Sequence, residues 1–121
     1  MNRSELLFLY DVTNANPNGD PMDDNKPRLD EETGINLVTD VRLKRTIRDY
    51  LNEAKGKEIF VREIHDENDN LQDAKLRAED FLLDENANKL DKNKVNMAEM
   101  KNIIGNNILK ECIDVRLFGA T

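Results

Sequence analysis

The sequence has 121 residues and a net charge of −7 at pH 7. This length leaves room for a single domain. The acidic balance argues against a protein whose whole surface binds nucleic acid, because such surfaces are normally basic. Any contact with nucleic acid must therefore be local.

The cysteine and histidine content limits the chemistry of the chain. A single cysteine, Cys112, cannot form an internal disulfide, and the only histidine is His65. We therefore expect Cys112 to be a small core residue rather than a nucleophile. No secretory leader and no apolar stretch of about 18–20 residues is found, so the chain is expected to be cytoplasmic.

The first predicted element is a buried strand over residues 4–12, because residues 6–9 are continuously apolar. A long loop follows over 13–36, with the sequence NANPNGDP at 14–21 near its start. A loop of this length is uncommon in a compact domain unless it binds something or is disordered. We therefore expect the loop to be functional.

A basic helix is predicted next, with Thr39 as its N-cap and Gly56 as its C-terminal stop. Apolar residues recur along it at helical spacing and are expected to face the core: Leu43, Ile47, Tyr50, Leu51 and Ala54. Four basic residues fan across the other side: Arg42, Lys44, Arg45 and Arg48.

The second half predicts a strand over 58–64, a polar insertion over 65–96 with a short helix at 74–83, and a helix capped by Asn96. The alternating sequence IDVRLF predicts a final strand over 113–118. The fold class is thus α+β, a partial ferredoxin-like or RNA-recognition-motif-like palm with two helices on one face. All 121 residues are assigned to the N-terminal part of this one palm domain, and no internal repeat is apparent.

Two metal sites are conceivable. Asn14, Asn16, Asn18 and Gly19 match the first half of a calcium-binding loop, but Asn25 stands where a closing glutamate is required. Carboxylates near the basic helix could instead hold Mg²⁺ on a phosphodiester, as in a metal-dependent nuclease. The candidate carboxylates are Asp11, Asp20, Asp23, Asp24 and Asp40.

The third candidate is a local phosphate-binding surface. Between Thr39 and Lys57, six basic residues against three acidic ones leave +3 inside a chain of net charge −7. Guanidinium groups and loop amides both bind phosphate oxygens. The alternative is a solvated amphipathic helix in which Asp49 and Glu53 are ion-pair partners. Physical chemistry alone does not decide between the two.

Three segments carry a resemblance to a known family: FLYDVTNANPNGDP (8–21), KPRLDEETGINLVTDVRLKRTIRDYL (26–51) and CIDVRLFGAT (112–121). In this order they resemble the CRISPR-associated Cas-seven family, the repeated backbone subunit of type I Cascade complexes. The type I-B branch is the most similar. Family members are more than twice as long, so the chain is expected to be an N-terminal portion.

The resemblance implies a non-catalytic subunit without a cofactor, copies of which polymerise along a guide RNA (crRNA). Target DNA then pairs with the guide, and other Cascade subunits are partners, with no membrane involved. Asp114 and Arg116 match a motif that is expected to support the palm or the RNA. The residues expected to bind RNA are Asn14, Asn16, Asn18, Gly19, Arg42, Lys44, Arg45 and Arg48.

Two other function classes stay open. One is a metal-dependent endoribonuclease that uses the loop aspartates, as in type III backbone relatives. The other is a small dimerising domain that binds no nucleic acid.

Overall fold

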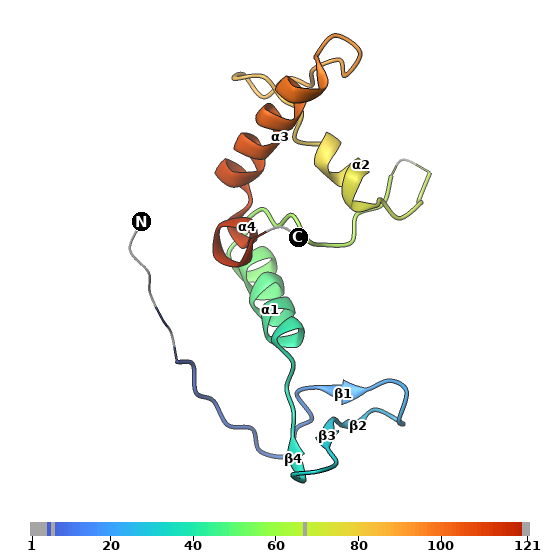
Figure 1. The fold of residues 1–121 in the computed structure, drawn as a ribbon, viewed down its shortest axis with the longest axis vertical. Helices are drawn as coiled ribbons and strands as arrows, with labels where there is room; N and C mark the ends of the chain where they lie inside the picture. Colours follow the sequence, from blue (N-terminus) through green and yellow to red (C-terminus); the bar gives the residue numbers. More distant parts are fainter. Residues whose placement is uncertain (1–4, 6, 67, 120–121) are drawn as a thin grey trace. The chain divides into compact units, whose positions relative to one another are not determined.

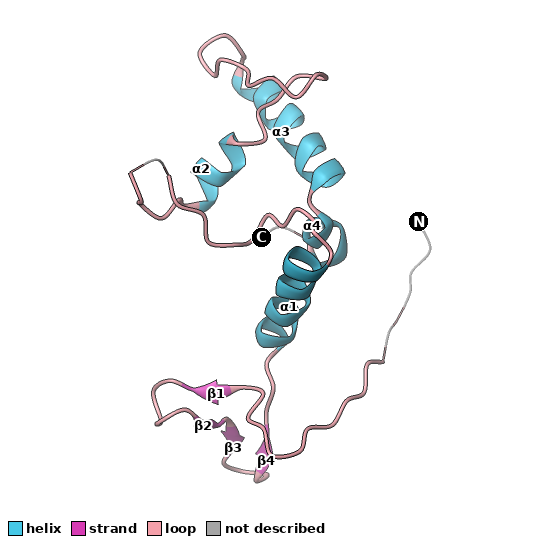
Figure 2. Cartoon of the chain, turned by 180° about the vertical axis from the view of Figure 1, so that it is seen from behind, coloured by secondary structure: helices cyan, strands magenta, loops and turns pink. Residues whose placement is uncertain are grey.

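The structure is a computed structural model that describes residues 5, 7–66 and 68–119. The chain divides into two compact units, Met1–Leu43 and Lys44–Thr121 (Figure 1). Among the described residues, every strand lies in the first unit, and every helix except the start of the first one lies in the second (Figure 2). The expected mixture of α and β structure is therefore confirmed.

The first unit contains two short β-hairpins within the segment predicted to be a long loop. Strand β1 (Gly19–Asp20) pairs antiparallel with β2 (Lys26–Pro27). Strand β3 (Leu29–Asp30) pairs antiparallel with β4 (Ile35–Asn36). The positive φ of Gly34, 69°, closes the second hairpin.

The strand predicted over 4–12 is wrong for the part of it that the structure describes. Residue 5 and residues 7–12 belong to no strand, and the side chains of Leu7 and Leu9 are 82% and 80% exposed. Ser4 and Leu6 lie outside the described residues. An apolar run forms a buried strand only where other strands pair with it, and no described strand does so.

The predicted basic helix is present as α1 (Asp40–Asp49), which continues into a π-helical turn, η1 (Tyr50–Ala54). Thr39 Oγ1 accepts a backbone N–H of the first turn at 3.3 Å, which confirms the N-cap. Gly56 has a φ of 59°, as a C-terminal stop requires. The predicted apolar stripe is only partly buried: Leu43, Ile47 and Leu51 are half-buried, whereas Tyr50 and Ala54 are exposed.

The second unit packs around a small core between α2 (Ala74–Glu79), α3 (Met97–Glu111) and α4 (Ile113–Phe118). The start of α2 and the Asn96 cap of α3 are confirmed, although α2 ends at Glu79 rather than at residue 83. Cys112 is fully buried, as expected, and burial raises the pKa of its thiol to about 11. The core cluster consists of Phe81, Ile108, Cys112 and Val115, with Phe60, Ala78 and Ile104 packed against it.

Two further strand predictions are wrong. The segment 58–64 is irregular, although Ile59 within it is 1% exposed. The segment 113–118 is the helix α4. Its alternating pattern would place neighbouring residues on opposite faces of a strand, yet Asp114 and Val115 are both buried. The predicted sheet covered by two helices is therefore not formed by the described residues.

The chain contains a short internal repeat, contrary to the expectation from its sequence: DENDN at 66–70 and DENAN at 84–88 form two matching turns. In each turn the first aspartate accepts the backbone N–H groups of the third and fifth residues, at 2.8 and 2.9 Å. Bonds from the asparagine at the fifth position are the largest cause that lowers the pKa of Asp66 and Asp84. The repeat therefore closes turns rather than forming a repeated fold.

Candidate nucleic-acid interface

Two asparagines of the 14–21 segment connect this loop to other parts of the first unit. Asn16 Nδ2 donates to the backbone oxygen of Asn25 at 2.6 Å, and Asn18 Nδ2 donates to that of Leu37 at 3.4 Å. Asn18 is only 9% exposed, whereas Asn14 is exposed and has a φ of 53°. Two of the predicted RNA contacts thus shape the loop through their side chains.

Gly19 is required by a close approach rather than by a positive φ. A Cβ at this position would lie 2.0 Å from Oδ1 and 2.8 Å from the backbone oxygen of Asn25. The sequence predicted a glycine in a turn at this position, but it could not predict that the backbone at Asn25 lies so close to it.

Arg42 lies beside the same loop. Its Nε donates to the backbone oxygen of Pro17 at 3.2 Å, and this bond joins the start of α1 to the 14–21 segment within the first unit. A guanidinium carries five N–H donors, so it can bond to more than one acceptor at the same time.

The cations of α1 that belong to the second unit have different surroundings. Arg45 Nε lies 2.8 Å from Asp49 Oδ1, and both side chains are more than 40% exposed. Arg48 Nε lies 3.1 Å from Asp114 Oδ2, its side chain is 13% exposed, and its guanidinium stacks over the Phe118 ring at 5.1 Å. Arg45 therefore faces solvent, whereas Arg48 is mostly enclosed.

Asp114 is the centre of a buried network. Its carboxylate is 0% exposed and accepts the N–H groups of Phe60 at 2.8 Å and Val61 at 3.1 Å in addition to the bond from Arg48. A buried charge is tolerated only when it is paired and fully hydrogen-bonded, as it is here. The carboxylate thus connects α1, the 58–64 segment and α4.

Arg116, in the same motif, has a different contact. Its guanidinium donates to the backbone oxygens of Leu109 and Lys110, at 2.7 and 2.6 Å. These carbonyls belong to the last turn of α3, where they lack intrahelical partners. The sequence could not reveal either bond, because only the fold brings these groups together.

Two of the carboxylates considered for a metal site, Asp20 and Asp23, are engaged within the first unit. Asp20 accepts the N–H of Met22 at 3.0 Å and lies 3.6 Å from Arg28. Asp23 pairs with Lys26 at 2.7 Å. Among the described residues, no group of three histidine, cysteine, aspartate or glutamate side chains is placed to hold a metal ion. None of the described helices is long and apolar enough to cross a membrane.

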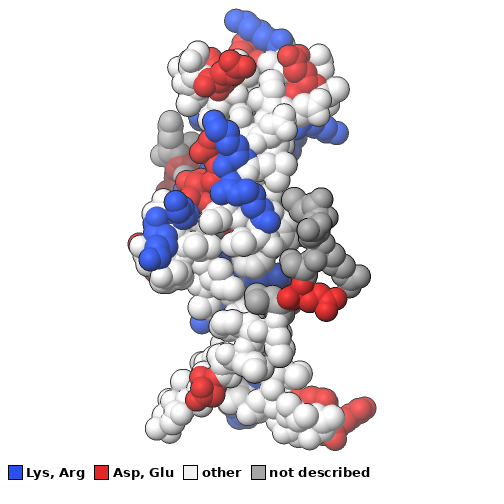
Figure 3. Space-filling view, turned by 90° about the vertical axis from the view of Figure 1, so that its left-hand side faces the viewer, with Lys and Arg blue, Asp and Glu red and all other residues white. Residues whose placement is uncertain are grey.

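The charged side chains are mixed rather than segregated. On the face drawn in Figure 3, lysine and arginine side chains lie next to aspartate and glutamate side chains. The chain as a whole has 25 acidic residues and 18 basic ones. Electrostatic attraction for a polyanion must therefore arise from a few cations at short range.

A comparison with known protein families shows which family this chain belongs to. A family model described as CRISPR-associated protein Cas7 matches residues 2–121. The chain belongs to the Cas7 family. This membership confirms the resemblance noted in the sequence, because the match covers nearly every residue.

A curated Cas7 relative has a local similarity. The CRISPR-associated protein Cas7 of Haloferax volcanii is 55% identical over 62 residues. These residues make up 51% of this chain but only 18% of the relative, so the match spans less than a fifth of that protein. No solved structure matches the chain.

Proposed function

We propose that this Cas7 chain binds guide RNA as part of a non-catalytic backbone subunit of a type I Cascade complex, of the I-B branch. In this role the guide pairs with target DNA, and the partners are further copies of the subunit and other Cascade proteins. We further propose that the chain contributes to an RNA-recognition-motif-like palm in which 65–96 is a variable insertion. Family membership and the local basic helix support this role.

The observation that carries the function is the concentration of cations on α1 in an acidic chain. Four basic residues lie within the ten residues of this helix. The ion pair of Arg45 with Asp49 is exposed, so it contributes at most about 1 kcal/mol and can be exchanged for a phosphate. Bidentate guanidinium–phosphate bonds are stronger than such surface pairs.

The proposed RNA contacts fall into two sets, one in each unit. In the first unit, Asn14, Asn16, Asn18 and Gly19 form the loop to which Arg42 is bonded. In the second unit, Lys44 and Arg45 offer direct phosphate contacts. Arg48 contributes mainly by fixing the helix, because Asp114 and Phe118 enclose its guanidinium.

The test is the salt dependence of binding to a fluorescent single-stranded RNA. For single strands, the logarithm of the binding constant falls against the logarithm of salt with a slope of about −0.7 per phosphate neutralised. Replacing Arg42, Lys44 and Arg45 by alanine is therefore expected to make the slope shallower by about 2. A matched control replaces Lys89, Lys92 and Lys94, whose side chains are more than half exposed, with the same loss of charge.

An unchanged slope in the α1 variant, or an equal change in the control, would exclude specific phosphate contacts on this helix. Adding Mg²⁺ or EDTA to the same RNA separates the two function classes. RNA cleavage that requires metal would favour the endoribonuclease alternative over a non-catalytic subunit. A dimer without any RNA affinity would favour the small dimerising domain.

A further inference from the structure

The first unit contains a pocket that the phosphate contacts do not use. It lies between the 10–18 segment and the 36–38 segment, with Pro27 at its edge, and has a volume of about 380 Å³. Pockets that bind small organic groups begin at about 300 Å³. None of the residues that line this pocket carries a charge. Its lining therefore suits a neutral group better than a phosphate.

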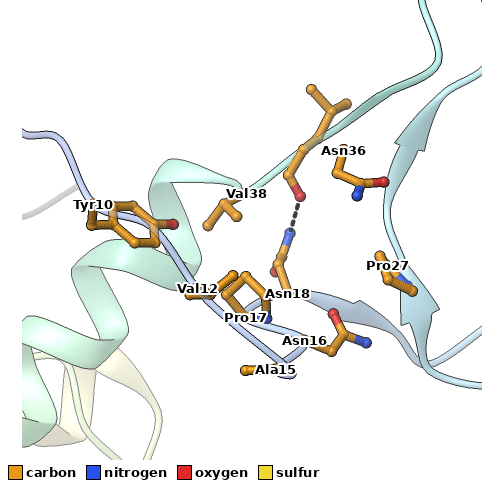
Figure 4. A pocket seen from close by; sticks show the side chains of 10 residues that line it. Tyr10, Val12, Ala15, Asn16, Pro17, Asn18, Pro27, Asn36 and Val38 are labelled. Atoms are coloured by element: carbon orange, nitrogen blue, oxygen red, sulfur yellow. Dashed lines mark hydrogen bonds between the residues drawn. The ribbon is translucent and has the colours of Figure 1, made fainter.

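Flat, apolar surfaces form two sides of the pocket. Figure 4 shows the Tyr10 ring on one side and Pro27 on the opposite side, with Pro17 between them. Tyr10 is 48% exposed, so its ring is accessible to a ligand. Unstacked nucleobases bind to proteins by stacking on such aromatic faces.

Carboxamides supply the polar side. Asn36 belongs to β4, is exposed, and has no hydrogen-bond partner for its side chain among the described residues. Asn18, which Figure 4 shows between the two walls, uses its nitrogen on Leu37 and leaves its oxygen available. A carboxamide offers a donor and an acceptor side by side, which matches the edge of a nucleobase.

The pocket is pre-formed by the bonds already described. Asn16 donates to the backbone oxygen of Asn25, and Asn18 donates to that of Leu37, so both ends of the 16–18 segment are fixed. Arg42 donates to the backbone oxygen of Pro17, a residue that lines the pocket, so a cation is bonded directly to the pocket lining. A neutral cavity with flat walls, and a cation bonded to one of its lining residues, has the chemistry of a nucleotide site.

We infer that this pocket takes one unstacked nucleobase of the bound single-stranded RNA, stacked on Tyr10 and hydrogen-bonded by Asn36, with its phosphate near Arg42. The inference rests on the proposed function and adds a base contact to a surface otherwise expected to hold only phosphates. Binding a base by stacking is tolerant of sequence, so the chain could still accept any guide.

The test compares a fluorescent oligoadenylate with an abasic ribose-phosphate oligomer of equal length, for the wild-type chain and single variants. We expect the wild-type chain to bind the abasic oligomer about tenfold more weakly, from the usual effect of losing one stacked base. Tyr10→Ala is expected to weaken oligoadenylate binding about tenfold and Asn36→Ala about fivefold. Neither change should alter binding of the abasic oligomer.

Control variants allow the base-binding pocket and the proposed phosphate binding to be tested independently. Met22→Ala removes a side chain that is 94% exposed and does not line the pocket, and circular dichroism checks the fold of each variant. Equal binding of both oligomers, unaffected by the variants, would overturn the pocket assignment and leave phosphate binding intact. No binding of either oligomer at low salt would overturn both. A dimer that Tyr10→Ala dissociates, with RNA binding unchanged, would assign the pocket to a second copy of the chain.

Discussion

The glycines of this chain differ in what they tolerate. At Gly19 an added Cβ would meet the Asn25 backbone oxygen at 2.8 Å, so either Gly19 or the chain at Asn25, just before β2, must shift. We expect Gly19→Ala to destabilise the first unit by about 1–3 kcal/mol, as overpacking does. At Gly105, inside α3, nothing lies within 4 Å. Gly105→Ala should therefore stabilise the chain by about 1 kcal/mol.

Urea unfolding followed by NMR signals of each unit measures both changes. A Gly19→Ala protein with unchanged stability in the first unit would show that Asn25 moves away at no cost. A destabilised Gly105→Ala protein would mean that this helix face is covered.

The aspartate of the 84–88 turn should show a pH dependence of defined sign. Bonds from the backbone and side chain of Asn88 lower the pKa of Asp84 from 3.8. Because the folded pKa lies below the unfolded one, the stabilisation is present above about pH 4 and is lost as the pH falls through the folded pKa. Asn88→Ala removes one donor and keeps the backbone bond, so the pKa of Asp84 should rise toward 3.8 without reaching it.

A ¹³C NMR titration of the carboxyl carbons measures this directly. Asp66 accepts the same set of bonds in the other turn, and its pKa should not change in the Asn88→Ala protein. Equal pKa values for Asp84 in both proteins would mean that the side-chain bond is absent in solution.

At the scale of elements, the pair of Arg48 and Asp114 connects the end of α1 to α4. Asp114→Asn keeps the size of the side chain but leaves the enclosed guanidinium without its counter-charge. Removing one partner of a buried pair typically costs about 3–5 kcal/mol. Asp49→Asn makes the same chemical change at an exposed pair and should cost less than about 1 kcal/mol.

Denaturant unfolding of the two variants gives the comparison. Similar losses for both would show that solvent reaches the buried pair and screens it. A larger loss for Asp49→Asn would contradict the assignment of Asp114 as the connecting residue.

The sequence predicted those elements whose signals are local. Thr39 and Asn96 were identified as N-caps because the bond each makes closes within three residues. The strand expected over 113–118 failed because the conformation of Asp114 depends on Arg48, Phe60 and Val61, which are 53 to 66 residues away in the chain. Alternation of apolar residues carries no information about such partners.

In the candidate site, too, only the features with local sequence signals were predicted. The basic residues of α1 were visible as a local charge excess, and the motifs around them led to the family. The enclosure of Arg48 and the inward side chain of Asn18 were not visible, because each depends on a partner brought near by folding. The pocket beside Tyr10 was missed for the same reason: its walls come from three separate segments.

At the scale of the whole molecule, binding to a polyanion should depend on local charge rather than on the total of −7. At 0.15 M salt the screening length is about 8 Å, so distant acidic residues contribute little. Asp49→Asn releases Arg45 from its ion pair and is expected to raise the affinity for single-stranded RNA about two- to fivefold. Glu85→Gln makes the same change of charge in the 84–88 turn, which lies at the end of the second unit away from α1 (Figure 1), and should leave the affinity unchanged.

Fluorescence anisotropy at 0.15 M salt measures both affinities, and repeating it at 0.02 M salt tests the screening. At the lower salt the Debye length exceeds about 20 Å, so Glu85→Gln should then also raise the affinity. Equal effects of the two variants at 0.15 M salt would mean that net charge governs binding. The proposal that the cations of α1 bind the RNA locally would then fail. Because the two variants carry the same net charge, any difference in their affinity for RNA must come from the position of the carboxylate that was removed.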